Sequence, residues 1–345
     1  MLTVSINGIN VQASEGMTVY EVAQSAGIYI PTLCYHPDLS TFGGCRVCMV
    51  EADGAYVTAC RAPVKDKMII KTDTEKGKKI QRVNVELVLT NHNKDCQTCA
   101  KNNNCKLQEV SAFVGITSER MDRLRRVVTA AESDTSNPVF NRDFSKCITC
   151  GICIRTCEEI NGVTAIDFAY RGCKTTISTV GNKPIRESKC ESCGECLERC
   201  PTGALTVKEQ VLPEREISTV CSYCGVGCGL ILGVRGNAVV SARGDRQSPV
   251  NDGHLCVKGR YGFGYINHPD RLKTPLIKKN GTFTEASWDE ALTLIAEKIT
   301  EVKENYGADA LAGLASARCT NEDNYLFQKL FRSLGTNNID HCARL

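Results

Sequence analysis

The residues with the strongest chemical signal are the cysteines, which number 22 in a chain of 345 residues. Eight of them form two runs with the spacing C-x2-C-x2-C-x3-C, and Pro201 follows the second run. The runs are Cys147, Cys150, Cys153 and Cys157, and Cys190, Cys193, Cys196 and Cys200. Four thiolates at this spacing are typical of cubane [4Fe-4S] clusters. Zinc is the alternative, but zinc ligands usually come as two separated pairs, so the pattern indicates two iron–sulfur clusters.

The double run resembles the two-cluster ferredoxins of bacteria, and we place this domain at residues 138–210. In that arrangement the fourth cysteine of each run ligates the other cluster. The resemblance therefore implies one cluster on Cys147, Cys150, Cys153 and Cys200, and a neighbour on Cys190, Cys193, Cys196 and Cys157.

Another cysteine set lies nearer the N-terminus, with the spacing C-x10-C-x2-C-x11-C. Its members are Cys34, Cys45, Cys48 and Cys60. Gly43 and Gly44 precede Cys45, where the backbone must wrap closely around an inorganic core. The stretch resembles the [2Fe-2S] ferredoxin domain of the large iron–sulfur subunit of respiratory complex I and of iron-only hydrogenases. This resemblance implies one [2Fe-2S] cluster in a β-grasp domain over residues 1–78, with a zinc ribbon as the alternative.

One imidazole and three thiolates follow as H-x3-C-x2-C-x5-C, namely His92, Cys96, Cys99 and Cys105. The spacing resembles the His-ligated [4Fe-4S] domain of complex I and related enzymes, which we place at residues 79–120. A neutral imidazole in place of a thiolate removes a negative charge from the site, which tends to raise the reduction potential. The alternatives are a zinc site and a helix-terminal histidine bonded to backbone.

The last cysteine set reads C-x2-C-x3-C with one more cysteine downstream, and comprises Cys221, Cys224, Cys228 and Cys256. The segments CSYCGVGCGL (221–230), GDRQSPVNDGHLCVKGR (244–260) and HPDRLKTPLI (268–277) resemble the start of a molybdopterin oxidoreductase, specifically a formate dehydrogenase catalytic subunit. The resemblance implies a fourth [4Fe-4S] cluster, in residues 214–270, beside a molybdenum or tungsten bis(molybdopterin guanine dinucleotide) cofactor. It also gives Lys258 a catalytic role, because the matching lysine helps electrons cross between cluster and pterin. An ordinary solvated lysine is the alternative.

The tail, residues 271–345, has the pattern of an incomplete α/β domain. Ser287 and Glu290 form a capping box before a helix with an apolar face, and Gly307 ends this helix. Short strands at 310–314 and 338–340 flank a second helix at 321–334. Ligands of doubly wound sheets lie at strand C-termini, and the segments SARCTNEDNY and GTNNIDHCARL match the family. The predicted cofactor contacts are Lys258, Arg318, Asn321, His341 and Arg344.

Local signals predict the remaining elements. Alternating apolar residues on both sides of Asn7-Gly8 indicate a β-hairpin. Further helices are expected at residues 18–26, 76–91, 107–114 and 120–128, a strand at 175–180, and linkers at 62–75 and 206–216. Arg123, Arg125 and Arg126 are expected to be exposed or to pair across a domain interface. Cys173, which belongs to no cysteine set, is expected to be a small buried residue.

Composition narrows the compartment and the partners. The net charge is +3, with 42 basic and 39 acidic residues, which gives no reason to expect nucleic acid or an anionic membrane as a partner. The N-terminus MLTVSINGIN has no apolar signal region, and no apolar run approaches the ~18 residues of a transmembrane helix. We therefore expect a cytoplasmic protein, and dense thiolates in a reducing cytosol favour electron transfer in an anaerobe over a disulfide scaffold.

The resemblances together imply an α+β multidomain protein with one [2Fe-2S] and four [4Fe-4S] clusters, whose ligands are nineteen cysteines and His92. The function implied is that of a formate dehydrogenase alpha subunit that relays electrons to flavin and NAD(P)-binding iron–sulfur subunits, with ferredoxin as a further partner. The alternative is a stand-alone electron-transfer subunit without its own catalytic centre. In formate dehydrogenases the metal-binding cysteine or selenocysteine follows the GTNNIDHCARL segment, so we expect a UGA-encoded selenocysteine at position 346.

Overall fold

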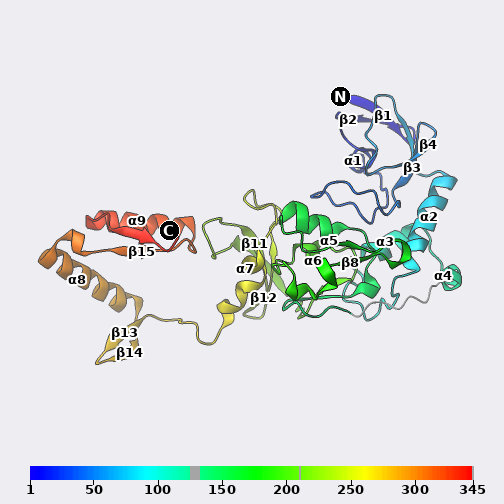
Figure 1. Cartoon of the computed structure of the whole chain (residues 1–345). Helices are drawn as coiled ribbons and strands as arrows, with labels where there is room; N and C mark the ends of the chain where they lie inside the picture. Colours follow the sequence, from blue (N-terminus) through cyan, green and yellow to red (C-terminus); the bar gives the residue numbers. More distant parts are fainter. Residues whose placement is uncertain (125–132, 210, 344–345) are drawn as a thin grey trace. The chain divides into compact units, whose positions relative to one another are not determined.

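The structure, a computed structural model, describes residues 1–124, 133–209 and 211–343, and it divides into two compact units, Met1–Glu209 and Gln210–Leu345 (Figure 1). Both units mix helices and strands, which agrees with the predicted α+β class. All 22 cysteines lie in the described residues, and each is a free thiol. None of the helices described here combines the length and the apolar character needed to cross a lipid bilayer.

The N-terminal part of the first unit is a five-stranded mixed sheet, in the order β2-β1-β5-β3-β4, with one helix. Its elements are β1 (Leu2–Ile6), β2 (Ile9–Ala13), α1 (Val19–Ser25), β3 (Met49–Ala52), β4 (Ala55–Thr58) and β5 (Ile69–Lys71). Asn7 and Gly8 both have positive φ, as a type I′ hairpin turn requires, so the predicted hairpin is confirmed. A capping box between Thr18 and Glu21 confirms the predicted start of α1.

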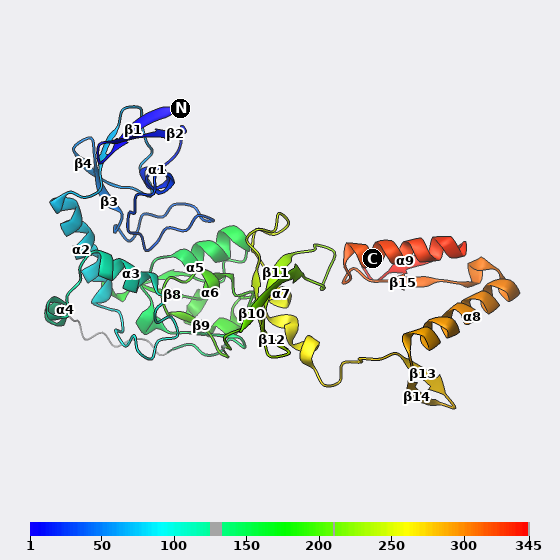
Figure 2. The ribbon, with the colours of Figure 1, turned by 180° about the vertical axis from the view of Figure 1, so that it is seen from behind.

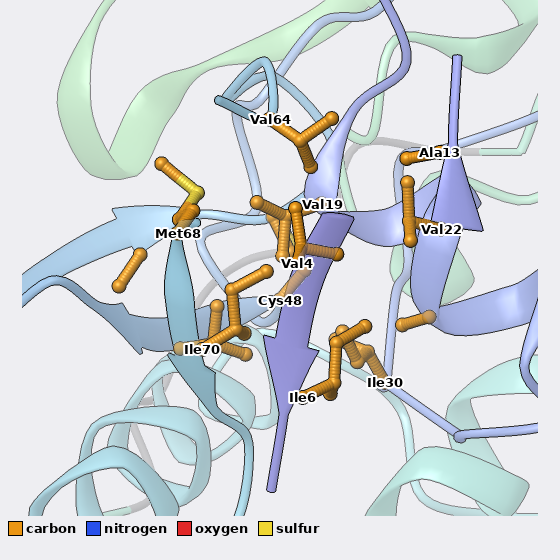
Figure 3. Close-up of a cluster of buried hydrophobic side chains, with 14 of the residues drawn as sticks. Val4, Ile6, Ala13, Val19, Val22, Ile30, Cys48, Val64, Met68 and Ile70 are labelled. Carbon is orange, nitrogen blue, oxygen red and sulfur yellow. The ribbon is translucent and has the colours of Figure 1, made fainter. Parts of the chain in front are cut away.

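The core of this sheet lies between β1, β5 and α1. Val4 and Ile6 of β1 and Ile70 of β5 are fully buried against Val19 and Val22 of α1 (Figure 3). β5 pairs with β1 in parallel, and its residues lie inside the segment that was predicted to be a linker. That prediction was wrong because the partner strand is more than 60 residues away in sequence, and no local signal reports such a pairing.

Three helices follow: α2 (Glu75–Leu89), α3 (Lys106–Phe113) and α4 (Ser118–Leu124). Thr74 accepts a hydrogen bond from the N–H of Gly77 and caps α2, close to the predicted start. A second apolar cluster joins these helices to the cysteine loop of the sheet domain through Leu33, Val47 and Val85. Arg123 is exposed and pairs with Glu119 one turn earlier in α4. Arg125 and Arg126, and the predicted helix beyond Leu124, lie outside the described residues.

The remainder of the first unit is built from short elements around a third apolar cluster. Two strand pairs, β6 (Phe140–Arg142) with β9 (Leu205–Val207) and β7 (Asp167–Ala169) with β8 (Thr176–Ser178), enclose α5 (Ile152–Arg155) and α6 (Glu195–Arg199). α5 and α6 contact each other and lie side by side in both views (Figures 1 and 2). The single turns are η1 (Phe144–Lys146), η2 (Thr156–Ile160), η3 (Gly172–Lys174), η4 (Val180–Asn182) and η5 (Ile185–Glu187).

Cys173 lies in η3 and is exposed, so the prediction that it is buried was wrong. Tyr170 and Gly172 on either side of Arg171 both have positive φ, which places the segment on a surface turn between β7 and β8.

The second unit begins with an antiparallel sheet of β10 (Arg215–Val220), β11 (Gly229–Arg235) and β12 (Ala238–Gly244), followed by α7 (Val257–Tyr261) and η6 (Gly262–Asn267). A hairpin of β13 (Leu276–Lys279) and β14 (Thr282–Glu285) leads into α8 (Trp288–Tyr306) and η7 (Ala308–Ala310). The chain then forms β15 (Gly313–Ala315), α9 (Asn321–Leu334) and β16 (Ile339–His341), with the two strands parallel. The predicted βαβ unit is confirmed, although β15 begins later than expected.

α8 starts at the predicted capping box of Ser287 and Glu290 and ends before Gly307. Its apolar face, by contrast, is not buried. Trp288, Leu292 and Ile295 are each more than half exposed, and no residue of α8 or α9 is buried in the part of the chain that the structure describes. Local signals therefore determine this helix, while the core implied by its apolar face is absent from the described residues.

Candidate iron–sulfur sites

Two cavities in the first unit share the lining residues Arg142, Ile166 and Leu205 and are therefore neighbours. The first is lined by Cys147, Cys150, Cys153 and Cys200, and the second by Cys157, Cys190, Cys193 and Cys196. Each cavity takes three cysteines from one run and the fourth from the other run. This is the grouping that a two-cluster ferredoxin arrangement requires, and ligation of clusters there stays a prediction.

The two runs reach their cavities by the same backbone path. Thr149 and Ser192 have φ values of 49° and 56°, and the glycine two residues after each is also left-handed. Both residues donate their backbone N–H to the Sγ atom two residues earlier, that of Cys147 or Cys190, at 3.4 Å. Hydrogen bonds from amides to cluster sulfurs are one of the factors that set cluster reduction potentials.

Burial raises the pKa of six thiols in these cavities, since a thiolate is poorly solvated there. The six are Cys147, Cys150, Cys153, Cys190, Cys193 and Cys196. Neighbouring cysteines raise most of these pKa values further, whereas the charge of Arg142 acts in the opposite direction on Cys147 and Cys190. Four thiolates in such a cavity need positive charge between them, which cluster irons supply. The donor set therefore fits a metal cluster.

A third cavity, of about 270 Å³, is lined by all four residues of the histidine set: His92, Cys96, Cys99 and Cys105. Burial, and then the charge of Lys146, lower the pKa of His92, so the imidazole is held in its neutral, metal-binding form. The Nδ1 atom of His92 and the hydroxyl of Ser111, which also lines the cavity, are buried without a hydrogen-bond partner. Unsatisfied buried polar atoms beside three thiols fit a site that receives a cofactor.

Three members of the N-terminal cysteine set, Cys34, Cys45 and Cys48, lie in the loop between α1 and β3, and Cys60 follows β4. The thiols of Cys34 and Cys45 hydrogen-bond to each other, which lowers the pKa of Cys34, and Cys48 pairs with Cys60 in the same way. A Cβ atom at Gly44 would lie 2.2 Å from the ring of Phe42. A larger residue at that position would displace the loop that carries Cys45.

The cysteine set of the second unit packs against Leu230 and Leu255, and its first member, Cys221, is buried. Burial raises the pKa of Cys221, and the charges of Cys256 and Cys224 raise it further, whereas Lys258 lowers it. Lys258 is half-buried in the first turn of α7, two residues after the N-cap Cys256. The structure therefore brings Lys258 within electrostatic range of the cysteines, and its side chain is only partly exposed to solvent.

Among the described residues, no three His, Cys, Asp or Glu side chains converge closely enough to hold a single metal ion. The two cysteine runs of residues 147–200 and the histidine set line cavities instead.

Each segment of the chain matches a known protein domain. Residues 214–268 match the molybdopterin oxidoreductase Fe4S4 domain, and residues 271–345 match the molybdopterin oxidoreductase domain. Upstream, residues 1–75 match a 2Fe-2S iron-sulfur cluster binding domain, residues 81–120 the NADH-ubiquinone oxidoreductase-G iron-sulfur binding region, and residues 146–204 a 4Fe-4S dicluster domain. Residues 214–345 are therefore similar to the first part of molybdopterin oxidoreductases, and residues 1–204 are similar to iron–sulfur domains.

Relatives extend along the whole chain. The NADPH-Fe(3+) oxidoreductase subunit alpha of Geobacter sulfurreducens is 38% identical over 100% of this chain and 40% of its own length. An NADH-quinone oxidoreductase subunit of Rhizobium meliloti is 34% identical, again over 100% of this chain and 40% of its own length. A Staphylococcus aureus protein named "Putative formate dehydrogenase" is 30% identical over 99% of this chain and 39% of its length. The chain thus spans about 40% of the length of these relatives.

A solved structure of an NAD+-reducing [NiFe]-hydrogenase in the H2-reduced state aligns with a TM-score of 0.56 and 27% identity. The alignment covers 60% of this chain and 87% of that one. More than half of the chain therefore shares its fold with a chain of that hydrogenase structure.

In the molybdopterin oxidoreductase tail, the ends of β15 and β16 bring Ala315 opposite His341. Asn321, at the start of α9, donates its side-chain N–H to the carbonyl of Gly225 at 2.6 Å, inside the loop between Cys224 and Cys228. The Ala317 amide, and then the Ser316 hydroxyl, lower the pKa of Cys342, and the charge of the exposed Arg318 adds a smaller effect. Arg344 lies outside the described residues. Asn321 is thus tied to the cysteine loop, whereas Arg318 and His341 lie at the exposed strand ends.

Two arginines that were given no role in the sequence analysis lie beside the cysteine sites. Arg142 is 5% exposed and Arg155 is 7% exposed, although arginine is rarely buried unless it is paired. Arg142 pairs with Asp134 at 3.3 Å and donates to the carbonyl of Ile177 at 2.8 Å. Their positions in the sequence could have indicated a role near the cysteine sites, because Arg155 lies between Cys153 and Cys157 and Arg142 lies shortly before Cys147.

Proposed function

We propose that this chain is the electron-transfer part of a molybdopterin oxidoreductase and holds five iron–sulfur clusters. The modules are residues 1–78 for the [2Fe-2S] cluster, 79–120 for the His-ligated cluster, 138–210 for the paired clusters, 214–270 for the fourth cubane, and 271–345 for the start of the pterin domain. The observation that carries the proposal is the pair of adjacent cavities, each lined by three cysteines of one run and one of the other.

When bound, the clusters supply the acceptance and release of single electrons. The thiolates that line the two cavities would ligate the irons. The backbone amides of Thr149 and Ser192 donate hydrogen bonds to the sulfurs of Cys147 and Cys190, and the Arg142 guanidinium, which lines both cavities, would offset negative charge there. The neutral imidazole of His92 reduces the negative charge of its own site.

We further propose that the full protein is a formate dehydrogenase alpha subunit that interconverts formate and CO2. The bis-pterin molybdenum or tungsten centre, when bound, supplies the acceptance of two electrons from formate. The support is the set of family segments at 221–230, 244–260 and 268–277, together with the name of the Staphylococcus relative. Lys258 would hold positive charge between cluster and pterin, and Asn321 would keep the pterin domain at the cysteine loop.

The electron acceptors are proposed to be flavin subunits that bind NAD(P), with ferredoxin as a further partner. Relatives named as NADH-quinone and NADPH-Fe(3+) oxidoreductase subunits, and the NAD+-reducing hydrogenase, support this class of partner. The same names favour the second candidate, a relay without formate chemistry.

The deciding experiment is anaerobic purification of the protein, followed by iron, molybdenum, tungsten and pterin analysis and a formate:viologen assay. About 18 irons per chain, with EPR signals of both cluster types after reduction, are expected from one [2Fe-2S] and four [4Fe-4S] clusters. A colourless or zinc-loaded protein would overturn the electron-transfer proposal. Full iron content without pterin or formate turnover would overturn the formate proposal and favour the relay.

A further inference from the structure

The loop that carries Cys34 contacts the two-cluster part of the first unit, more than 100 residues later in the chain. Arg155 of α5 donates through Nη2 to the carbonyl of Cys34 at 2.6 Å and through Nη1 to the carbonyl of Ser40. Ser40 in turn donates its N–H to Glu159 at 2.7 Å. The rings of Phe42 and Phe168 stack with centroids 5.7 Å apart. The contact is therefore made of directed hydrogen bonds as well as apolar surface.

Arg155 occupies a special position in this contact. It lies between Cys153, which lines the first cavity, and Cys157, which lines the second. Its guanidinium also lies over the ring of Phe42, 5.5 Å from the centroid. One side chain thus joins both candidate cubane sites, through two short backbone segments, to a ligand of the candidate [2Fe-2S] site.

The charge of Arg155 is not offset in the way that the charges of its neighbours are. Arg199 pairs with Glu195 and with Asp38, the latter at 2.9 Å, and Arg142 pairs with Asp134. Both hydrogen bonds of Arg155 go to carbonyl oxygens, and within the described residues no carboxylate forms an ion pair with it. Its Nε is buried without a partner. A guanidinium keeps its charge at all ordinary pH values, so a buried positive charge lies directly against the Cys34 loop.

We propose that Arg155 is a positioning residue for electron transfer between the [2Fe-2S] site and the paired cubane sites, and that its charge raises the reduction potential of the [2Fe-2S] site. The inference rests on the proposed cluster content. The bidentate guanidinium fixes the separation of the two sites. It belongs to α5, whose residue Cys153 lines the first cubane cavity, and it donates to two carbonyls of the loop that carries Cys34. Positive charge near a cluster stabilises the reduced form, which carries one more electron.

The test uses the anaerobically purified full chain and compares Arg155→Met, Arg155→Lys and the control Arg123→Met, which changes an exposed arginine of the same unit. An EPR-monitored redox titration gives the midpoint potential of the [2Fe-2S] signal, and its relaxation enhancement reports the distance to the nearest cubane. We expect Arg155→Met to lower the reduced-to-oxidised ratio at fixed poise at least about tenfold, which is 59 mV for one electron. Arg155→Lys should keep the potential but weaken the relaxation enhancement, since lysine retains the charge and loses the fork.

An unchanged potential in Arg155→Met with full iron content would overturn the role of the charge, and unchanged relaxation in both variants would overturn positioning. If Arg155→Met loses iron, the relaxation enhancement of Arg155→Lys alone tests the positioning role. Arg155→Gln then takes the place of Arg155→Met in the measurement of the potential. Absence of any [2Fe-2S] signal from the wild-type protein would instead overturn the cluster assignment on which both proposals rest.

Discussion

The two units of this chain hold cysteine sets in different ways. In the first unit three apolar clusters surround the cysteines, and the helices that flank the sites bury residues such as Val85 and Val110 completely. In the part of the second unit that the structure describes, a smaller buried cluster contains Cys221, Leu230 and Leu255, with a few half-buried neighbours. The cysteine sets of the first unit are therefore packed among more buried apolar side chains than the set of the second unit.

The contrast is sharpest in the tail. α8 and α9 each begin with a capping box and end at a glycine with positive φ, so short-range interactions define both helices. Many of their apolar side chains, among them Leu292 and Leu326, are nevertheless exposed, as is Leu314 on β15, at 84%. Helices gain most of their stability in proteins from packing an apolar face, and exposed apolar patches mark surfaces that another segment or a partner covers. The tail therefore needs a covering surface that the described residues do not provide.

The largest effect is expected from replacing one cysteine that lines the first cavity of the first unit. Cys150→Ser should lose about four of roughly 18 irons per chain, because a cubane needs four protein ligands. Cys173→Ser is the matched control, since Cys173 is exposed and belongs to no ligand set. Iron analysis and EPR of both variants measure this, and equal iron in the two would break the distinction between ligand and spare thiol.

A pair of isoleucines tests the difference in packing. Ile70→Ala removes a fully buried side chain and should lower the free energy of unfolding of the first unit by about 2–5 kcal/mol, the cost of a core cavity. Ile295→Ala, at a residue that is 53% exposed, should change the free energy of unfolding of the second unit by no more than about 0.5 kcal/mol. Anaerobic guanidinium unfolding followed by circular dichroism gives both values. Similar losses would mean that α8 is buried in solution.

Hydrogen exchange sharpens the same comparison without a mutation. Amides in the middle of α8 should exchange at least about tenfold faster than those around Val85 in α2, because helices without buried contacts open locally at low cost. Mass spectrometry of the full chain measures both. Equal protection would show that a surface covers α8, and would point to self-association or to a bound partner.

The smallest effect concerns a contact at the edge of the first unit. A hydrogen bond from Lys106 lowers the pKa of Glu109 below its usual 4.5, opposed by partial burial and assisted by the Tyr29 hydroxyl at 2.8 Å. Because the folded pKa is depressed, this stabilisation is present above pH 4.5 and is lost as the pH falls through the folded value. Glu109→Gln should remove this loss of stability at acidic pH. The change in the free energy of unfolding should be less than about 1 kcal/mol, because the Lys106–Glu109 pair is exposed. The same change at exposed Glu304 should not.

The features that could be predicted from the sequence were those determined by residues close together in the chain. Asn7-Gly8 makes its hairpin, Thr18 and Ser287 cap their helices, and α9 has the predicted bounds. The cysteine sets were visible because metal ligands must recur at short, regular spacing. The cavities then show which cysteines share a site, and spacing alone does not determine this grouping.

The features that were missed depend on distant partners. β5 exists because β1 offers an edge for pairing, and Arg155 is buried because Cys34 and Ser40 present carbonyls to it. Cys173 was misplaced because a small apolar residue carries no information about the turn that holds it. Likewise, the apolar stripe of α8 shows that a covering surface is needed but does not identify it.

The shared fourth cysteines have a consequence for how the first unit matures. A cluster on the second set would tie Cys157 to Cys190, and this loop is nested inside the one that a cluster on the first set would close between Cys153 and Cys200. Joining the inner pair shortens the chain that must be gathered for the outer pair, so the entropic cost of the second closure falls. Filling of the inner site should then favour filling of the outer site during assembly, so that the wild-type chain gains the two clusters cooperatively.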